Sequence, residues 1–319
     1  MTRRRSLAAL AGFAGVPRLG LAAASQPSIP VSFSVPAHAC DCHTHIFGPP
    51  DRFPLWSGRT YTPEAASPEE MAALHQALHI ERVVIVTPSV YGVDNSAMLY
   101  GLKARGRSAR GIAVIGDQTT DRDLDTMDRA GVRGIRLNLA TLGQKDPAIA
   151  RRRLQAAIGR VRPRGWHVQI FVDAFLIPSL KTLVQDSAVP VVFDHFGGAK
   201  ATAGLAQAGF PDLLDLLRSG HAYVKVSAAH RISAQLPDCP DVLPLAKALV
   251  AANPDRVLWG TDWPHPDSNP PASRPISEVS PLLKIDDARL LNLLPAWAHD
   301  PAIRQRILVD NPARLYGFL

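Results

Sequence analysis

Two histidines separated by one residue are the first feature of this chain that could do chemistry. They lie in the segment Asp41-Cys42-His43-Thr44-His45, which has the apolar start and the length of a strand. Because side chains alternate along a strand, we expect Asp41, His43 and His45 to share one face. Imidazole is a common ligand of zinc and related metals, so this face predicts a metal site or a group that polarises a carbonyl. Packing in a core is the simpler alternative for an isolated pair.

A third histidine and an acid each stand at the end of an apolar run. His195 ends the run 191–195, and Asp262 ends the run 257–262. Burying a carboxylate alone is unfavourable, so Asp262 would need a metal, a histidine or a bound water as its partner. The structural alternatives are a histidine packed against a backbone carbonyl and an acid that caps a helix.

Eight short, mostly apolar runs alternate with helix-like segments, as expected for parallel strands buried on both faces. The predicted strands are 39–47, 82–87, 111–115, 132–137, 167–172, 189–195, 223–227 and 256–261. The helix-like segments include 68–78, 124–130, 147–160, 178–186, 210–219 and 242–252. This order predicts an α/β fold, the (β/α)8 TIM barrel, with C-terminal helices that close it. A doubly wound open sheet is the alternative, but it needs a glycine-rich loop where this chain has Cys42-His43-Thr44-His45.

The four candidate residues fall at the ends of the first, sixth and eighth predicted strands. The carboxyl ends of the strands carry the active site in barrels of this kind. We therefore expect His43, His45, His195 and Asp262 to form one catalytic site at that mouth.

The N-terminal 25 residues predict an export signal of the twin-arginine type. Three arginines at positions 3–5 precede an apolar stretch that ends in three alanines at 22–24. A mitochondrial presequence or a misassigned start codon is the alternative. We expect a linker at 26–36, a single barrel domain over 37–319, and a periplasmic location.

The composition excludes several classes of protein. The chain has a formal net charge of +7, and the four arginines in its first 25 residues account for all but +3 of it. Basic runs with interleaved aromatics are absent, so we expect no nucleic-acid partner. No apolar run reaches the length of a membrane span without charges, so we expect no stable membrane insertion of the mature chain. Cys40, Cys42 and Cys239 are too few for a disulfide framework and are interpreted as small apolar residues.

Together the three motifs resemble the amidohydrolase-related family of (β/α)8 hydrolases. Within that family the chain is most similar to hydrolases of the 2-pyrone-4,6-dicarboxylate lactonase type. The resemblance covers about residues 35–319, nearly the whole chain. Other matching phrases are TPSVYGVDN at 87–95, GIRLN at 134–138, VKVS at 224–227 with Arg231, GTDWPH at 260–265 and DNP at 310–312.

The resemblance implies a role for each candidate residue. His43, His45 and Asp262 would bind a metal, and Asp262 would act as the general base on water. His195 would bind the metal or polarise the substrate carbonyl.

The chain also departs from the superfamily pattern at two strand ends. Arg136 and Asn138 stand at the end of the fourth strand, where the superfamily has a lysine or glutamate, and no histidine ends the fifth strand. A two-metal site is therefore not expected. One divalent metal, zinc, and no metal at all both stay open, because the pyrone lactonase type hydrolyses without a divalent ion.

Two arginines near strand ends predict an anionic, carboxylate-bearing substrate. The planar guanidinium groups of Arg136 and Arg231 suit bidentate binding of a carboxylate. Ser89, Tyr91 and Asn95, after the second strand, could add hydrogen bonds. Ion pairs with acids at the barrel mouth are the structural alternative for the arginines.

The predicted function is hydrolysis of a carboxylated lactone or ester by water that Asp262 activates. A non-oxidative decarboxylase or a sugar-acid lactone isomerase on the same scaffold is the alternative. An exported binding protein without catalysis fits less well, because the histidines and the acid are all present. A monomer or a homodimer would suit either enzyme.

Overall fold

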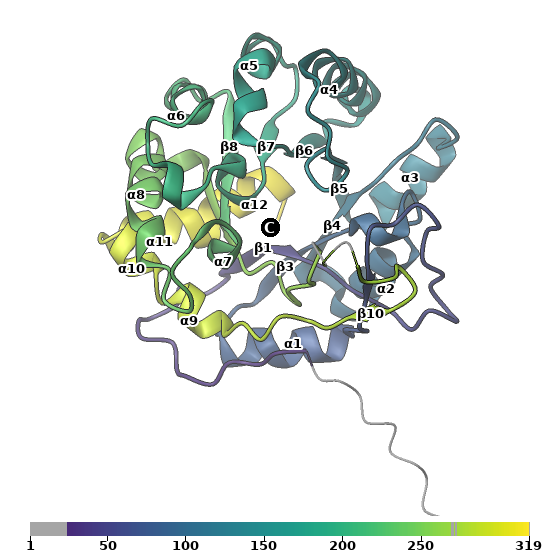
Figure 1. Cartoon of the computed structure of the whole chain (residues 1–319), viewed down its shortest axis with the longest axis horizontal. Helices are drawn as coiled ribbons and strands as arrows, with labels where there is room; N and C mark the ends of the chain where they lie inside the picture. Colours follow the sequence, from purple (N-terminus) through teal and green to yellow (C-terminus); the bar gives the residue numbers. More distant parts are fainter. Residues whose placement is uncertain (1–23, 269–270, 272, 319) are drawn as a thin grey trace, which may run out of the picture.

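Eight parallel strands form one sheet that curls into a barrel in the computed structural model, which describes residues 24–268, 271 and 273–318 (Figure 1). Each strand pairs with the next barrel strand along the chain. The strands are β1 (Cys40–Thr44), β3 (Arg82–Val86), β4 (Ala109–Ala113), β5 (Val132–Asn138), β6 (His167–Phe171), β7 (Val191–Phe193), β8 (Ala222–Ser227) and β9 (Val257–Gly260). All eight strands predicted from the sequence are confirmed, with ends that differ by a few residues.

The barrel closes between β1 and the residues that follow β9. The N–H of Asp262 donates to the carbonyl of His43, and the N–H of His45 donates to the carbonyl of Trp263, both at 2.8 Å. Gly260 permits this approach, because a Cβ on it would lie 2.8 Å from the backbone nitrogen of His43. The first and last strands therefore join at the place where the candidate histidines and Asp262 stand.

Helices surround the barrel and cover the outer faces of its strands (Figure 1). They are α1 (Pro68–Ala77), α2 (Ser96–Arg105), α3 (Asp121–Arg129), α4 (Pro147–Val161), α5 (Ile177–Gln185), α6 (Phe210–Arg218), the short α7 (Ala229–Ile232) and α8 (Leu243–Ala252). Local sequence sets where they begin. Ser67 with Glu70 at α1, and Thr120 with Asp123 at α3, form capping boxes that satisfy free backbone N–H groups.

The predicted C-terminal helices are present, and the last of them closes one end of the barrel. They are α9 (Asp287–Leu291), α10 (Leu294–Trp297), α11 (Pro301–Gln305), a π-helical turn (Arg306–Asp310) and α12 (Asn311–Tyr316). Tyr316 and Phe318 pack in the barrel interior with the two cysteines of β1 and with Val84 and Leu258. Arg110 fixes this end of the chain by donating to the carbonyls of residues 316 and 317. The interpretation of the cysteines as small apolar residues fits this position, since all three are buried and free.

The residues before β1 pack on the outside of the barrel. The N–H of Ser28 donates to Asp286 at 2.8 Å, and that of Ser32 donates to Asn292 at 2.7 Å. The segment expected as a linker at 26–36 is thus held against α9. Most of the predicted export signal, residues 1–23, lies outside the described residues. Among the described residues, no helix combines the length and the apolarity that a membrane span requires.

A small second sheet ties two loops together. Strand β2 (Thr62–Pro63) pairs in parallel with β10 (Val279–Ser280), and the hydroxyl of Thr62 donates to the carbonyl of Ile276 at 2.5 Å. Since β2 follows β1 and β10 follows β9, the loops that leave the two closing strands are joined to each other.

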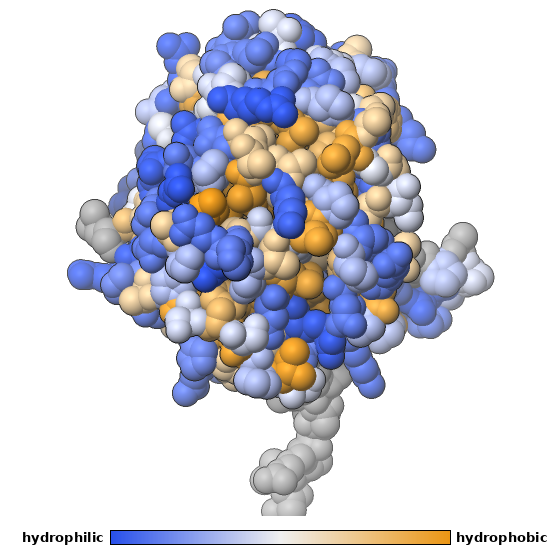
Figure 2. All heavy atoms as spheres, turned by 90° about the vertical axis from the view of Figure 1, so that its left-hand side faces the viewer, coloured by the Kyte–Doolittle hydropathy of each residue, from blue (hydrophilic) through white to orange (hydrophobic). Residues whose placement is uncertain are grey.

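The outer surface mixes hydrophilic and hydrophobic residues. Figure 2 shows the side of the molecule that lies at the left of Figure 1, where hydrophilic residues surround apolar ones gathered near the middle of the face. The residues that could do chemistry are not part of such a surface, because they are buried.

The closure at Gly260 generates a prediction about stability. Gly260→Ala forces a methyl group against the backbone of β1, so we expect the free energy of unfolding to fall by about 1–3 kcal/mol. Gly159→Ala is the matched control, because no atom lies within 4 Å of its added methyl in α4. That control should raise the free energy of unfolding by up to about 1 kcal/mol. Equal effects in urea denaturation would contradict the proposed role of Gly260 in closure.

Candidate active site

A β-bulge in β1 brings both histidines of the pair to the barrel interior. Cys42 and His43 together stand opposite one residue of β3, where the register shifts. The side chain of Asp41 instead lies 3.3 Å from Nε2 of His75 on α1, and it accepts from the N–H of Thr261 at 3.0 Å. The prediction that Asp41 shares a face with the two histidines is therefore wrong, because the extra residue of the bulge reverses the alternation.

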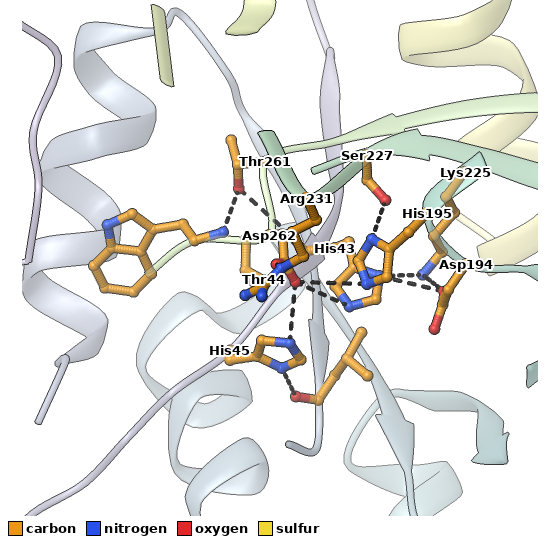
Figure 3. Close-up of polar contacts among 12 residues, drawn as sticks. His43, Thr44, His45, Asp194, His195, Lys225, Ser227, Arg231, Thr261 and Asp262 are labelled. Atoms are coloured by element: carbon orange, nitrogen blue, oxygen red, sulfur yellow. Dashed lines mark hydrogen bonds and ion pairs between the residues drawn. The ribbon is translucent and has the colours of Figure 1, made fainter. Parts of the chain in front are cut away.

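The carboxylate of Asp262 is the centre of the site. Its Oδ1 lies 3.6 Å from Nε2 of His43, 3.4 Å from Nε2 of His45 and 3.7 Å from Nε2 of His195. Its Oδ2 accepts a short hydrogen bond from Nε of Arg231. Figure 3 shows the three rings turned toward the same carboxylate, those of His43 and His45 from the end of β1 and that of His195 from the end of β7. The structure thus brings together all four residues that the sequence analysis predicted as catalytic.

Left-handed backbone conformations occur where these strands end. His195, Ala228 and Asp262 have φ angles of 47°, 56° and 71°. Such conformations cost a non-glycine residue on the order of 1–3 kcal/mol and persist only where the surroundings impose them. At Asp262 the surroundings include the hydrogen bond of its N–H to β1. The strain therefore accompanies the placement of the catalytic groups.

The charges of the site follow from burial and from Arg231. Burial lowers the pKa of His195 to about 4 and that of His43 well below its usual value, so both rings are neutral near pH 7. Burial alone would raise the pKa of Asp262, but Arg231 and then His195 hold it well below its usual range. The carboxylate of Asp262 is therefore ionised beside the neutral rings of His43 and His195.

The outward nitrogens of two rings are fixed by hydrogen bonds. Nδ1 of His45 lies 2.7 Å from the carbonyl of Val86, so Nδ1 carries a proton and Nε2 is the nitrogen that faces Asp262. Nδ1 of His195 lies 2.9 Å from the hydroxyl of Ser227. These contacts hold the rings in place before any ligand arrives.

The residues present fit one divalent metal. Nε2 of His45 lies 3.4 Å from Oδ1 of Asp262, a separation at which both atoms can bind one ion. Nε2 of His43 is buried and has no hydrogen-bond partner among the described residues. The ligand atoms of His43, His195 and Asp262 lie within 4.8 Å of one another. Imidazole nitrogens and a carboxylate oxygen at this spacing are the donor set that zinc prefers.

A cavity of about 370 Å³ opens onto this cluster. It carries three cationic side chains, those of Arg136, Lys200 and Arg231. Its other polar lining residues include His45, Tyr61, Ser89, Asn138, Thr141, His195, His230, Asp262 and Ser268. A groove of about 1100 Å³ adjoins it and shares three of these residues. Three acids also line it: Asp173, Asp262, which is paired with Arg231, and Asp267, which is paired with Arg274. The cavity is therefore polar and carries charges of both signs.

The predicted substrate-binding residues divide into two groups. Ser89, Arg136 and Arg231 line the cavity. The hydroxyl of Tyr91 accepts a backbone N–H from the loop after β1 at 3.0 Å. Oδ1 of Asn95 accepts from the hydroxyl at the end of β3 at 2.7 Å and from a backbone N–H after β4 at 2.8 Å. The structure therefore places Asn95 as a brace of its loop, while Tyr91 braces its loop and also lines the adjoining groove.

Four residues of the site were not among the predicted residues. Asp194 and Lys225 lie beneath His43, while Tyr61 and Lys200 line the cavity. Lys225 carried a signal, because a charged residue inside the otherwise apolar strand β8 requires a buried partner. The sequence around Tyr61 gave no such signal, because the loop that carries Tyr61 reaches the cavity only through the pairing of β2 with β10. Burial raises the pKa of Tyr61 to about 12, so it is a neutral phenol.

Comparisons with known proteins agree with this geometry. The family model described as amidohydrolase matches residues 40–318. The 4-sulfomuconolactone hydrolase of Rhizobium radiobacter is 36% identical over 92% of this chain and 94% of its own length. The D-galactarolactone isomerase of Agrobacterium fabrum is 29% identical over 88% of this chain and 91% of its own.

A solved structure gives the same result. A protein from Pseudomonas putida, described as a putative 2-pyrone-4,6-dicarboxylic acid hydrolase, superposes with a TM-score of 0.70 and 30% identity, over 90% of this chain and 99% of its own. The resemblance inferred from the motifs around His43, His195 and Asp262 is confirmed by the match that spans the whole barrel. The chain belongs to the amidohydrolase family.

Proposed function

We propose that the protein is an enzyme that hydrolyses a carboxylated lactone. One observation supports this most directly: Asp262, an ionised carboxylate, is surrounded by three imidazoles beneath a cavity whose wall includes Arg136 and Lys200. The relatives named as lactone hydrolases support the same reaction class.

Hydrolysis needs a base for water and a group that stabilises charge on the carbonyl oxygen. Asp262 accepts a proton as the water oxygen bonds to the lactone carbonyl carbon. The bond from that carbon to the ring oxygen then breaks, and the ring oxygen takes up the proton held by Asp262, which gives a hydroxy acid, or an enol acid where the lactone is an enol ester. His195 lines the cavity and lies beside Asp262, where it can position the carbonyl.

Two of the cations are suited to hold the carboxylate of the substrate. Arg136 donates to Asp194 through its Nε, so its two terminal nitrogens can donate to a ligand in the cavity. Lys200 is exposed at the cavity wall. Arg231 is already engaged by Asp262, Ser268 and the carbonyl of residue 266. We therefore assign the anion site to Arg136 and Lys200, and the support of Asp262 to Arg231.

A kinetic comparison tests the base and the anion site separately. With 2-pyrone-4,6-dicarboxylate as the probe, Asp262→Asn should lower kcat by about 10²–10⁴-fold, because an amide cannot take the proton from water. Lys200→Ala should raise KM about tenfold with kcat nearly unchanged, because it removes binding energy shared by substrate and transition state.

The substrate range is part of the same test. Uncharged lactones of equal ring size should be poor substrates of the wild-type enzyme. Equal turnover of charged and uncharged lactones, or full activity in Asp262→Asn, would contradict the proposal.

We propose that the metal is a single zinc ion held by His43, His45, His195 and Asp262. When bound, the ion polarises the carbonyl and lowers the pKa of water toward about 7. The fit rests on the converging lone pairs of these residues.

Protein purified without chelator should contain one zinc per chain by plasma mass spectrometry. Removal of the zinc should abolish lactone hydrolysis, and its return should restore activity. Full activity of metal-free protein would instead assign the imidazoles a direct role as hydrogen-bond donors.

A lactone isomerase is the second candidate, because the galactarolactone isomerase is similar over 88% of the chain. The products distinguish the two reactions. Hydrolysis releases an acid and consumes water, so the oxygen of labelled water enters the product. Isomerisation of a sugar-acid lactone retains the ring and incorporates no label.

We also propose that the enzyme acts in the periplasm after twin-arginine export. The support is the basic start of the chain and the apolar stretch that follows it. Cell fractionation should recover a shortened chain in the periplasm, and Arg4→Lys with Arg5→Lys should retain the full-length chain in the cytoplasm. Identical distribution of both chains would exclude this route.

A further inference from the structure

A second polar cluster lies directly beneath the site, in the barrel interior. Asp194, Lys225 and Gln169 are 0–1% exposed, and Arg136 is 7% exposed. Nζ of Lys225 donates to Oε1 of Gln169 at 2.5 Å and lies 3.7 Å from Oδ1 of Asp194. Figure 3 shows Asp194 and Lys225 on the side of the His43 ring that faces away from Asp262. The cluster therefore contacts the site through His43, and through Arg136, which also lines the cavity.

The two carboxylate oxygens of Asp194 are not satisfied equally. Oδ2 accepts from Nε of Arg136 at 3.1 Å and from Nε2 of Gln169 at 3.0 Å. Oδ1 has no hydrogen-bond partner among the described residues if the proton of His43 is left unassigned. A buried, ionised oxygen without a donor is one of the most unfavourable arrangements in a protein core.

Nδ1 of His43 can form a hydrogen bond with either of two neighbours. It lies 3.3 Å from Oδ1 of Asp194 and 3.4 Å from Nζ of Lys225. In the first case Nδ1 carries the proton and donates it to the carboxylate. In the second case Lys225 donates to an unprotonated Nδ1, and the proton of the ring moves to Nε2.

The balance of donors and acceptors decides between the two cases. Lys225 already donates to Gln169, so it loses little if Nδ1 offers it no acceptor. Oδ1 of Asp194 has no other donor at hydrogen-bonding distance among the described residues. A hydrogen bond to a carboxylate is also stronger than one between neutral groups. The Nδ1–H form of His43 is therefore the favoured one.

We propose that Asp194 is a positioning residue that keeps the proton of His43 on Nδ1, so that the lone pair of Nε2 points at the metal position beside Asp262. Lys225 forms an ion pair with the carboxylate of Asp194 and does not donate a hydrogen bond to the imidazole of His43. The proposal rests on the single-metal site proposed above. In this form His43 carries its proton on Nδ1, the same nitrogen that is protonated in His45, where it donates to the carbonyl of Val86. Carboxylate and carbonyl groups in this position orient metal-binding histidines in many proteins.

The tautomer of His43 can be measured without any catalytic assay. In metal-free protein labelled with ¹⁵N-histidine, long-range proton–nitrogen spectra distinguish Nδ1–H from Nε2–H rings, and a His43→Gln variant assigns the signal. We expect Nδ1–H in the wild type. In Asp194→Asn the carboxylate is lost and Lys225 can donate to Nδ1, so Nε2–H should dominate.

Zinc affinity is the second readout. Chelator competition should show a loss of about 10–100-fold in Asp194→Asn. The double variant Asp194→Asn with Lys225→Met balances the buried charge and removes the competing donor. The amide oxygen at position 194 can then accept from Nδ1 again, so we expect recovery of the Nδ1–H signal and of part of the zinc affinity.

Asp287→Asn is the matched control, because Asp287 is a buried acid that contacts another histidine, His265, at 3.0 Å. It should lower stability without changing the tautomer of His43. A wild-type His43 protonated on Nε2, or unchanged tautomer and affinity in Asp194→Asn, overturns the proposal. If the wild type binds zinc in the Nδ1–H form but hydrolyses no lactone, the proposed function fails and this inference stands.

Discussion

The buried carboxylate of Asp262 is the group on which the arrangement of the mouth depends. It stands where the barrel closes, and its own N–H makes one of the backbone hydrogen bonds that join the last strand to the first. An ionised oxygen in such a place requires positive charge or donors around it. Arg231 meets Oδ2, and three imidazoles stand around Oδ1, so the same residue links closure of the fold to the chemistry of the site.

The interior of the barrel is layered along its axis. Tyr316 and Phe318 pack with apolar side chains at the N-terminal end. Above them lies the cluster of Gln169, Asp194 and Lys225, in which every charge has a partner of the opposite sign. The imidazoles and Asp262 form the next layer, under the cavity. The buried cluster contacts the layer above it through His43 and through Arg136, which Asp194 holds at the cavity wall.

Much of the fold and of the candidate site could be predicted from the sequence, for specific physical reasons. Strands buried on both faces are uniformly apolar, so the eight strands were visible as separate runs. Polar residues at the ends of such runs must meet at one end of a parallel barrel, and His43, His195 and Asp262 do meet there. The roles of Tyr91 and Asn95 were harder, because a loop residue can face the cavity or brace its own loop with the same sequence.

The sequence by itself determined the barrel fold and which side chains stand at its mouth, because the pattern of apolar residues shows which segments are buried strands and in what order they follow. Only the tertiary structure decided which way those groups point. The bulge in β1 reverses the side of Asp41, and the pairing of β2 with β10 brings Tyr61 over the cavity. The neighbours of His43 on β7 and β8 are far from it in the chain, and they meet its Nδ1 only once the barrel has closed. Register, closure and contacts between distant strands depend on the whole chain at once, and no local pattern contains them.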